Sequence, residues 1–189
     1  PMPIRIGIIS AKGGSGKTTL AVNLARAIQL DGNAVVVIDT DPQRTATHWG
    51  NRQPEGYGLP VRHVNDAEGD TLHERLCAAS EGSDFAVIDG SAKIDGGTGA
   101  VVRASHAALI PVQPTPADTW GAASVVTVAK ETGTTAALVV SRQIVGTNLA
   151  GEIADGLKAY ELPILDSRTS QRVAYAESMF EGRTVLDVP

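Results

Sequence analysis

The start of the chain combines a short β-branched run, a glycine-rich stretch and a helical pattern. Residues 4–9 have the composition of a β-strand, and the sequence Lys12-Gly13-Gly14-Ser15-Gly16-Lys17-Thr18-Thr19 follows them almost directly. From Lys17 to about Leu30, apolar side chains recur at the spacing of a helix. Backbone N–H groups in a glycine-rich turn, together with the N-terminus of the next helix, bind phosphate groups at close range. This order of elements therefore predicts a phosphate site in an α/β fold.

The glycine-rich stretch matches the phosphate-loop pattern G-x-x-x-x-G-K-[ST] at Gly16, Lys17 and Thr18, but Ala11 stands where the first glycine is expected. An additional lysine, Lys12, precedes the usual one by five residues. We expect Lys17 to bind the β- and γ-phosphates of a nucleotide and the Thr18 hydroxyl to ligate Mg²⁺. The neighbouring residues expected to cradle the phosphates are Gly13, Gly14, Ser15, Gly16 and Thr19.

The rest of the chain alternates apolar runs of strand type with helical patterns. Strands are expected at 34–38, 85–89, 107–112 and 136–141, with weaker peripheral candidates at 61–64 and 162–165. Helices are expected near 70–80, 97–105, 118–131, 147–159 and 170–180. Such alternation implies right-handed crossovers and an open sheet. We therefore predict an α/β fold of the P-loop NTPase type: a single domain over residues 1–189, in three layers, with a mostly parallel central sheet flanked by helices.

Composition restricts the class of protein. Hydrophobic residues make up 42% of the chain and charged residues 20%, which is ordinary for a globular protein. No apolar run is long enough to span a bilayer, no signal-peptide pattern opens the chain, and Cys77 is its single cysteine. We therefore expect a cytoplasmic protein with no membrane partner. The histidines are scattered without ligand-like spacing, which argues against structural zinc.

Acidic residues follow two of the expected strands at their carboxyl ends. Asp39 and Asp41 end the second strand, and Asp89 ends the run 85–89. In a doubly wound sheet this edge lies beside the phosphate loop. Asp89 fits the acid that holds Mg²⁺ in P-loop proteins, although an aspartate before Gly90 is also typical of a turn. Asp41 could instead cap the helix that follows, a role compatible with catalysis.

The stretch 12–18 resembles the deviant Walker A motif of the ParA/MinD group of P-loop ATPases, and the sequence 39–43, Asp-Thr-Asp-Pro-Gln, is similar to the ParA signature. The resemblance implies that Lys12 reaches across a dimer interface to the nucleotide of the partner subunit; a solvated loop lysine is the alternative. It also implies that Asp41 orients or activates the attacking water and that Asp39 supports the Mg²⁺ shell. The predicted catalytic residues are therefore Lys12, Lys17 and Asp41.

The resemblance also indicates the nucleotide. The family uses ATP, and the chain has no Asn-Lys-x-Asp pattern of the kind that reads guanine. ATP and Mg²⁺ are therefore the expected cofactors. Residues 141–143, Ser-Arg-Gln, end a late strand where such proteins contact the base. Arg142 and Gln143 are thus candidate base contacts, and both are equally compatible with a solvated surface.

Further segments look like the small ParF-type partition ATPases: Trp49 after the signature, and the runs 85–90, 110–116 and 169–172. Members of this branch lack the N-terminal helix-turn-helix domain of larger ParA proteins, and we expect none here because the first strand begins at Ile4. They commonly continue through a C-terminal helix, so the end at Pro189 suggests a truncated chain.

The resemblance implies an ATP-dependent homodimer that binds DNA of the nucleoid without sequence preference, and a ParB-like or other cargo adaptor that stimulates hydrolysis. A net charge of −5 argues against a protein that coats nucleic acid with its whole surface, but not against a local basic patch. The candidate DNA contacts lie towards the end of the chain: Lys158, Arg168, Arg172 and Arg183. Ordinary solvated side chains are the alternative for each of them.

These expectations leave several functions open. Partition of plasmid or chromosomal DNA is the first, and the same switch could instead position carboxysomes or chemoreceptor clusters on the nucleoid. A MinD-like membrane-positioning ATPase would need a C-terminal amphipathic helix, which residues 180–189 do not suggest. An iron–sulfur carrier would need more cysteines than Cys77, and a ligase would need a substrate pocket that the sequence does not indicate.

Overall fold

The structure is a computed structural model, and it describes residues 2–64, 70–91, 96–144, 153 and 155–188. Within these residues the strands are β1 (Ile4–Ile8), β2 (Val35–Asp39), β3 (Val61–His63), β4 (Phe85–Asp89), β5 (Ala107–Val112) and β6 (Thr135–Val140). They form one parallel sheet in the order β3-β2-β4-β1-β5-β6.

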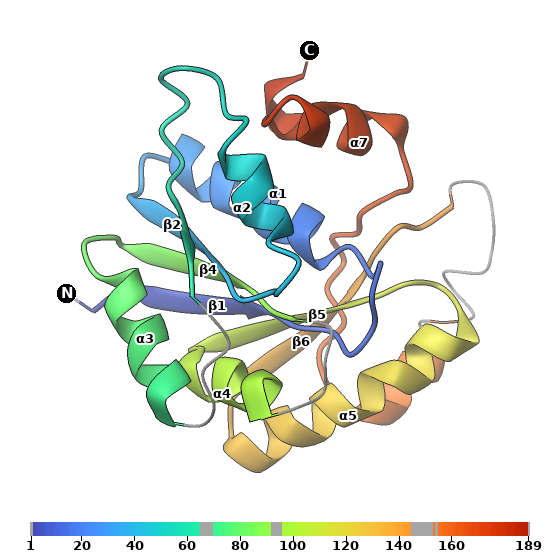
Figure 1. Ribbon diagram of the computed structural model, residues 1–189. Coiled ribbons are helices and arrows are strands. Elements are labelled where there is room, and N and C mark those ends of the chain that lie inside the picture. Colours follow the sequence, from blue (N-terminus) through green and yellow to red (C-terminus); the bar gives the residue numbers. More distant parts are fainter. Residues whose placement is uncertain (1, 65–69, 92–95, 145–152, 154, 189) are drawn as a thin grey trace.

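Helices cover both faces of the sheet. The α-helices are α1 (Lys17–Leu30), α2 (Thr45–Gly50), α3 (Asp70–Ser80), α4 (Gly96–Ala104), α5 (Pro116–Thr132) and α7 (Val173–Phe180), and two short 3₁₀ helices are η1 (Lys158–Tyr160) and η2 (Val185–Asp187). Figure 1 shows α1, α2 and α7 on one side of the sheet and α3, α4 and α5 on the other. The predicted α/β fold with three layers is confirmed.

The strand order brings the carboxyl ends of three strands together. β1 lies in the middle of the sheet between β4 and β5, and β2 pairs with the other side of β4. The register places Asp89 beside Ile8 on one side and beside Asp39 on the other. Parallel sheets of this kind bind ligands at the carboxyl edge, where the strand order reverses. The loop after β1 and the acids of β2 and β4 therefore meet at this edge.

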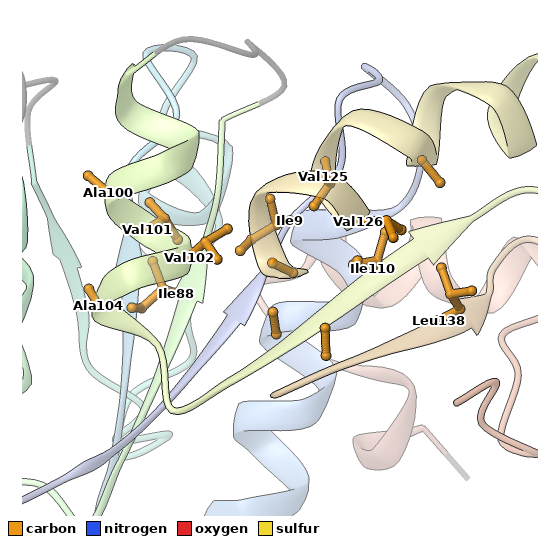
Figure 2. Packing of buried hydrophobic residues seen from close by; sticks show 14 of the residues in the cluster. Ile9, Ile88, Ala100, Val101, Val102, Ala104, Ile110, Val125, Val126 and Leu138 are labelled. Atoms are coloured by element: carbon orange, nitrogen blue, oxygen red, sulfur yellow. The ribbon is translucent and has the colours of Figure 1, made fainter. Parts of the chain in front are cut away.

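Two apolar cores lie on opposite faces of the sheet because successive strand residues point to opposite sides. Val36 and Ile38 of β2 pack into the core under α3, α4 and α5, whereas Val35 and Val37 pack into the core under α1 and α2. Figure 2 shows the first core, where Ile9 lies among valines of α4 and α5. β2 is buried along its whole length, as expected of a parallel strand covered on both faces.

The predicted strand at 162–165 is wrong. Only a single parallel bridge joins Ile164 to Leu138 of β6 in the described chain. Leu138 donates to the carbonyl of Pro163 at 2.8 Å and accepts from Leu165 N–H at 2.9 Å. Pro163 has no N–H to donate to β6, so the ladder cannot extend towards Leu162.

The later helices differ from the predicted bounds. α7 begins at Val173 rather than 170, because Ser170 forms a bridge with Gln143 beside the sheet. Of the helix predicted at 147–159, residues 147–152 and 154 lie outside the described residues, while Ile153 and residues 155–157 are helical and lead into η1. The six-residue helix α2 was not predicted, since its sequence is too short to show a period.

Candidate nucleotide-binding site

The phosphate loop joins β1 to α1 in a conformation that suits glycine. Gly16 is the N-cap of α1 with φ 90°, and Gly14 has φ 75°. Left-handed backbone costs a residue with a Cβ about 1–2 kcal/mol, so glycine is favoured at both positions. The helix then begins at Lys17, as predicted, and its unpaired N–H groups lie at the carboxyl edge of the sheet.

Side chains from neighbouring strands hold the loop in shape. Ser141, just after β6, donates its hydroxyl to the carbonyl of Ser15 at 2.8 Å, and both side chains are buried. The carbonyl of Gly14 accepts from Arg142 Nη1 at 2.9 Å and from Gln113 Nε2 at 3.0 Å. The loop is therefore organised by donors that come from outside it.

Lys17 is buried under the loop. Its Nζ donates to the carbonyl of Lys12 at 2.8 Å. Burial lowers the pKa of Lys17, and the nearby carboxylates of Asp89 and Asp41 oppose this change. A buried ammonium group between acids and a phosphate loop is well placed to bind a phosphate group.

Thr18 and Asp89 come together as the sequence predicts. The Thr18 hydroxyl donates to Asp89 Oδ2 at 2.7 Å, and Asp89 is fully buried. The other carboxylate oxygen, Oδ1, is buried without a hydrogen-bond partner in the described structure. Burial raises the pKa of Asp89 to about 7, and the hydrogen bond from Thr18 opposes this. A buried acceptor without a donor beside a hydroxyl fits Mg²⁺, which takes oxygen ligands and relieves the cost of a buried charge.

Asp39 has a different set of contacts. Its Oδ2 accepts from the N–H of Thr47 at 2.8 Å and from the Thr47 hydroxyl at 2.7 Å, and its Oδ1 accepts from the N–H of Asp41 at 3.0 Å. The carboxylate thus satisfies an N–H in the first turn of α2 and holds that helix to the end of β2. Its role in the Mg²⁺ shell stays a prediction.

Asp41 lies at the edge of the site. The side chain is half-buried, and its Oδ1 accepts from the N–H of Gln43 at 2.8 Å, which is a local turn. The N-cap residue of α2 is Arg44, so Asp41 is not the cap of that helix. Asp41 lines the cavity described next, so a catalytic role is geometrically open to it.

A cavity of about 1030 Å³, large enough for a nucleotide, lies at this edge of the sheet. Asp39 and Asp89 are not among the described residues that line it. The phosphate loop forms one wall with Gly13, Gly14, Gly16, Lys17, Thr18 and Thr19, while Ser15 is buried beneath it. Asp41 and the residues after it form the second wall. The third wall consists of Thr169, Ser170, Gln171, Arg172, Val173, Tyr175, Ala176 and Met179. The sequence did not predict this wall, since its only signal there was a family resemblance at 169–172 that indicated no nucleotide contact.

The profile of the CobQ/CobB/MinD/ParA nucleotide binding domain matches residues 6–185 of the chain. The chain belongs to this family. The match spans all three walls of the cavity and the strands that position them, and the chain is thus a ParA/MinD-family P-loop ATPase domain.

Individual ParA/MinD-family proteins are similar to the chain at low identity. Maintenance of carboxysome distribution protein A from Halothiobacillus neapolitanus is 24% identical over 97% of this chain and 87% of its own length. The chromosome-partitioning ATPase Soj from Thermus thermophilus is 30% identical over 58% of this chain and 54% of its own length. An ATP complex of a Cyanothece McdA variant has a TM-score of 0.82 at 18% identity, covering 99% of this chain and 90% of that one. This last similarity is one of fold.

The additional lysine of the phosphate loop, Lys12, does not line the cavity in the described structure. Its Nζ lies 3.2 Å from Asp118 Oδ2 in the first turn of α5, and its side chain is 43% exposed. Asp118 also accepts a hydrogen bond from the Thr115 hydroxyl. Lys12 therefore points away from the phosphate site of its own chain.

The two candidate base contacts, Arg142 and Gln143, differ in their position relative to the cavity. Arg142 lines the cavity, with φ 53° and its guanidinium on the loop carbonyl of Gly14. Gln143 is not among the described residues that line it, and its backbone pairs with residues 169–171. A contact of either side chain with the base stays a prediction.

The candidate DNA contacts lie in different parts of the structure. Arg172 lines the nucleotide cavity, and Arg183 follows α7 on the same side of the sheet. Lys158 lies 2.6 Å from Asp155 in a segment that packs against α5, on the opposite side. Arg168 is exposed between β6 and α7. Their contacts with DNA stay predictions.

Among the described residues, no helix is both long enough and apolar enough to cross a bilayer. The same part of the chain holds no group of three or more His, Cys, Asp or Glu side chains that could bind a metal ion.

Proposed function

We propose that the chain is a ParA-type ATPase that dimerises on ATP, binds DNA without sequence preference and drives partition of plasmid or chromosomal DNA. The observation that carries the proposal is the combination of one nucleotide-sized cavity with a buried Lys17, the Thr18–Asp89 pair and Asp41 at its rim. A partner protein on the cargo stimulates hydrolysis and thereby limits the lifetime of the dimer.

Different residues of the chain carry out the separate steps of ATP binding and hydrolysis. Lys17 and the loop N–H groups bind the β- and γ-phosphates. Thr18 and Asp89 would hold Mg²⁺, which neutralises charge on the phosphates when it is bound. Asp41 accepts a hydrogen bond from the attacking water and so orients it towards the γ-phosphate.

Lys12 supports a dimer as the working form. In one chain its ammonium lies on Asp118 and outside the cavity, so it does not contribute to the site of that chain. A half-exposed lysine next to a phosphate loop is free to reach a nucleotide bound by a second copy. There it would stabilise charge in the transition state, as an arginine finger does.

Binding to DNA follows from phosphate contacts, which need only a few basic side chains. Arg168, Arg172 and Arg183 are exposed, with Arg172 at the start of α7 and Arg183 shortly after its end, and a dimer doubles their number. Lys158 is a weaker candidate because Asp155 already pairs with it. The dimer is therefore expected to localise to the nucleoid, and its affinity for DNA should fall as salt is added.

A second cargo is favoured by one comparison. The carboxysome distribution protein of H. neapolitanus aligns with 97% of this chain, whereas Soj aligns with 58%. The same ATP-dependent switch would then position a protein cargo, such as a carboxysome, on the nucleoid. Both cargoes use the same site chemistry, and capture of the chain's adaptor protein would tell them apart.

The experiment compares two matched lysine variants. Lys12→Ala should abolish dimerisation with the non-hydrolysable analogue AMPPNP, measured by light scattering, while nucleotide affinity measured by calorimetry changes little. Lys130 is the control, since it also lies 3.2 Å from a carboxylate, on Glu161, and is 46% exposed. Lys130→Ala should dimerise like the unmodified chain. Equal dimerisation of all three proteins would refute the role of Lys12.

Two further measurements complete the test. Asp41→Ala should lower ATP turnover about 10²- to 10⁴-fold, the range for a lost acid–base group. Glu55→Gln, at an exposed loop position, should not lower it. Anisotropy of a labelled duplex of arbitrary sequence should rise only when ATP is present, and less at higher salt. An ATP-bound dimer that leaves the duplex free at low salt would rule out the DNA-binding function.

A further inference from the structure

The strand β3 forms one edge of the sheet, and part of its backbone has no partner among the described residues. β3 pairs with β2 alone in this part of the chain. The carbonyl of Pro60 and the N–H of Val64 both bond to β2, at 2.9 Å and 3.0 Å. Successive residues of a parallel strand direct their N–H and C=O groups to opposite sides. The backbone groups of Val61 and His63 therefore point outward, and no described residue bonds to them.

A further cavity, of about 460 Å³, lies between β3 and α2. Its lining combines polar and apolar groups without any charged side chain, and consists of Thr47, Gly50, Asn51, Gln53, Gly58, Leu59, Pro60 and Val61. Such a lining suits an uncharged side chain of a bound molecule. We call this cavity, together with the outward backbone of Val61 and His63, the β3 groove.

The segment that surrounds the β3 groove carries an excess of positive charge. Residues 44–63 hold three arginines, Arg44, Arg52 and Arg62, and one acid, Glu55. All four side chains are exposed. The whole chain has 21 acidic against 16 basic residues, so this segment has the opposite sign to the chain as a whole. The charge around the β3 groove therefore complements an acidic partner.

We propose that the β3 groove docks an extended, acidic segment of the cargo adaptor, which joins the sheet as a strand beside β3. The inference rests on the proposed function, in which an adaptor protein stimulates hydrolysis. An unpaired sheet edge favours a polypeptide over nucleic acid, because it matches the spacing of another polypeptide backbone. β3 has only three residues, so backbone pairing alone is short, and the cavity supplies the side-chain contact that completes the site.

The side chains of the docked segment should alternate between two environments, because successive strand residues point to opposite faces of a sheet. Val61 packs against the core under α1 and α2 and lines the cavity, so one face of the segment lies over the cavity. Arg62 points to the other face, where its Nη1 donates to the carbonyl of Ala79 at the end of α3 at 2.6 Å. We therefore expect apolar residues of the segment on the cavity side and acids beside Arg62.

The helix α2 connects the β3 groove to the nucleotide site. Thr47 lines the cavity of the groove and donates both its N–H and its hydroxyl to Asp39. Asp39 also accepts from the N–H of Asp41, which lines the nucleotide cavity. α2 has six residues, too few for a helix to be stable without such contacts. A segment seated in the β3 groove thus contacts the helix that Asp39 holds beside Asp41, which gives an adaptor a physical route to hydrolysis.

The test measures amide hydrogen exchange by two-dimensional NMR with a defined probe, a heptapeptide of alternating glutamate and valine. In the unmodified chain the N–H groups of Val61 and His63 should exchange faster than that of Val64, which already bonds to β2. At ten times its dissociation constant, the peptide should slow exchange at Val61 and His63 about tenfold, because only the free chain exchanges there. Exchange at Val64 should change little. A peptide with the same residues in block order, glutamates before valines, should have no effect.

Two substitutions in the chain and one in the peptide test the contacts. Asn51→Trp should fill the cavity and raise the dissociation constant of the alternating peptide at least about tenfold, through the lost burial of valine. Glu161→Trp is the control, because Glu161 is 82% exposed and lies on Lys130, away from the β3 edge. It should bind the peptide like the unmodified chain, and both variants should keep the unmodified melting temperature. Glutamine in place of glutamate in the peptide should weaken binding at least about threefold, and less at high salt.

The outcomes separate the inference from the proposed function. If the chain dimerises with AMPPNP and binds DNA while the alternating peptide leaves exchange at Val61 and His63 unchanged, the inference fails and the proposed function stands. If the peptide slows exchange at both residues but the chain stays a monomer with AMPPNP, docking of an acidic segment stands and the proposed function fails. Slowing by a DNA duplex, or by a second copy in the AMPPNP dimer without peptide, would assign the edge to that occupant and overturn the inference. Equal binding of the glutamine peptide would overturn its acidic character.

Discussion

The carboxylate of Asp187 connects the 3₁₀ helix η2 to the rest of the domain. Its replacement by asparagine should measurably lower the free energy of unfolding. Its Oδ1 lies 2.7 Å from Arg26 Nη2 of α1, and its Oδ2 accepts from the Tyr57 hydroxyl at 2.6 Å and from the Thr184 hydroxyl at 2.7 Å. The Arg26 guanidinium also stacks over the Tyr57 ring, 4.2 Å from its centroid. One carboxylate thus ties η2 to α1 and to the loop before β3.

The pKa of Asp187 gives the size of the effect. Burial raises this pKa, but the hydrogen bonds from Tyr57 and Thr184 and the contact with Arg26 outweigh it and lower the value from 3.8 to about 2. At about 1.4 kcal/mol for each tenfold change in proton affinity, the ionised group contributes about 2 kcal/mol at pH 7. Because the folded-state pKa is lowered, this stability is complete above pH 4 and is lost as the pH falls towards 2.

Urea unfolding followed by circular dichroism measures the difference. Asp187→Asn should lower the free energy of unfolding by about 2 kcal/mol at pH 7, and the gap should narrow below pH 4, where the unmodified chain loses the same contribution. Asp155→Asn breaks an ion pair that is exposed on both sides and should change little. An Asp187→Asn chain as stable as the unmodified one at pH 7, or a gap that does not depend on pH, would refute the reasoning.

Two other substitutions test the backbone and the phosphate loop. Gly182→Ala should lower the free energy of unfolding, measured in urea, by more than about 2 kcal/mol, because φ is +69° and the new Cβ would collide with the Arg52 carbonyl. Gly32 is the control: its φ is +88° and the space around it is open, so Gly32→Ala should lower the free energy of unfolding by only about 1–2 kcal/mol. Equal losses of stability in the two variants would exclude the collision. Ser141→Ala should lower the free energy of unfolding by about 1–3 kcal/mol, because it leaves the buried Ser15 carbonyl without its donor. Calorimetry should also show weaker nucleotide binding. Unchanged stability and nucleotide affinity would show that this hydrogen bond does not organise the loop.

The sequence predicts those parts of the site whose residues lie close together in the chain. The phosphate loop was predicted because Gly16, Lys17 and Thr18 match the phosphate-loop pattern between an apolar run and a helical pattern. The structure gives Gly14 and Gly16 the left-handed backbone that suits glycine. Asp89 was predicted because an acid at the end of an apolar strand lies at the carboxyl edge of a parallel sheet. The α/β fold followed from the same local periodicity, with the exception of 162–165, where an apolar run with a proline made one bridge and no strand.

The contacts that complete the site depend on positions far apart in the chain, which no local pattern encodes. Lys12 and Asp118 are separated by 106 residues and meet because the sheet places α5 beside the phosphate loop. The contact of the Asp39 carboxylate with Thr47, eight residues further along the chain, forms because α2 packs against the end of β2. The sequence by itself determined the phosphate chemistry, through backbone conformation and strand ends. Only the tertiary structure decided what stands around it, because helix docking sets which distant side chains share a cavity or a face.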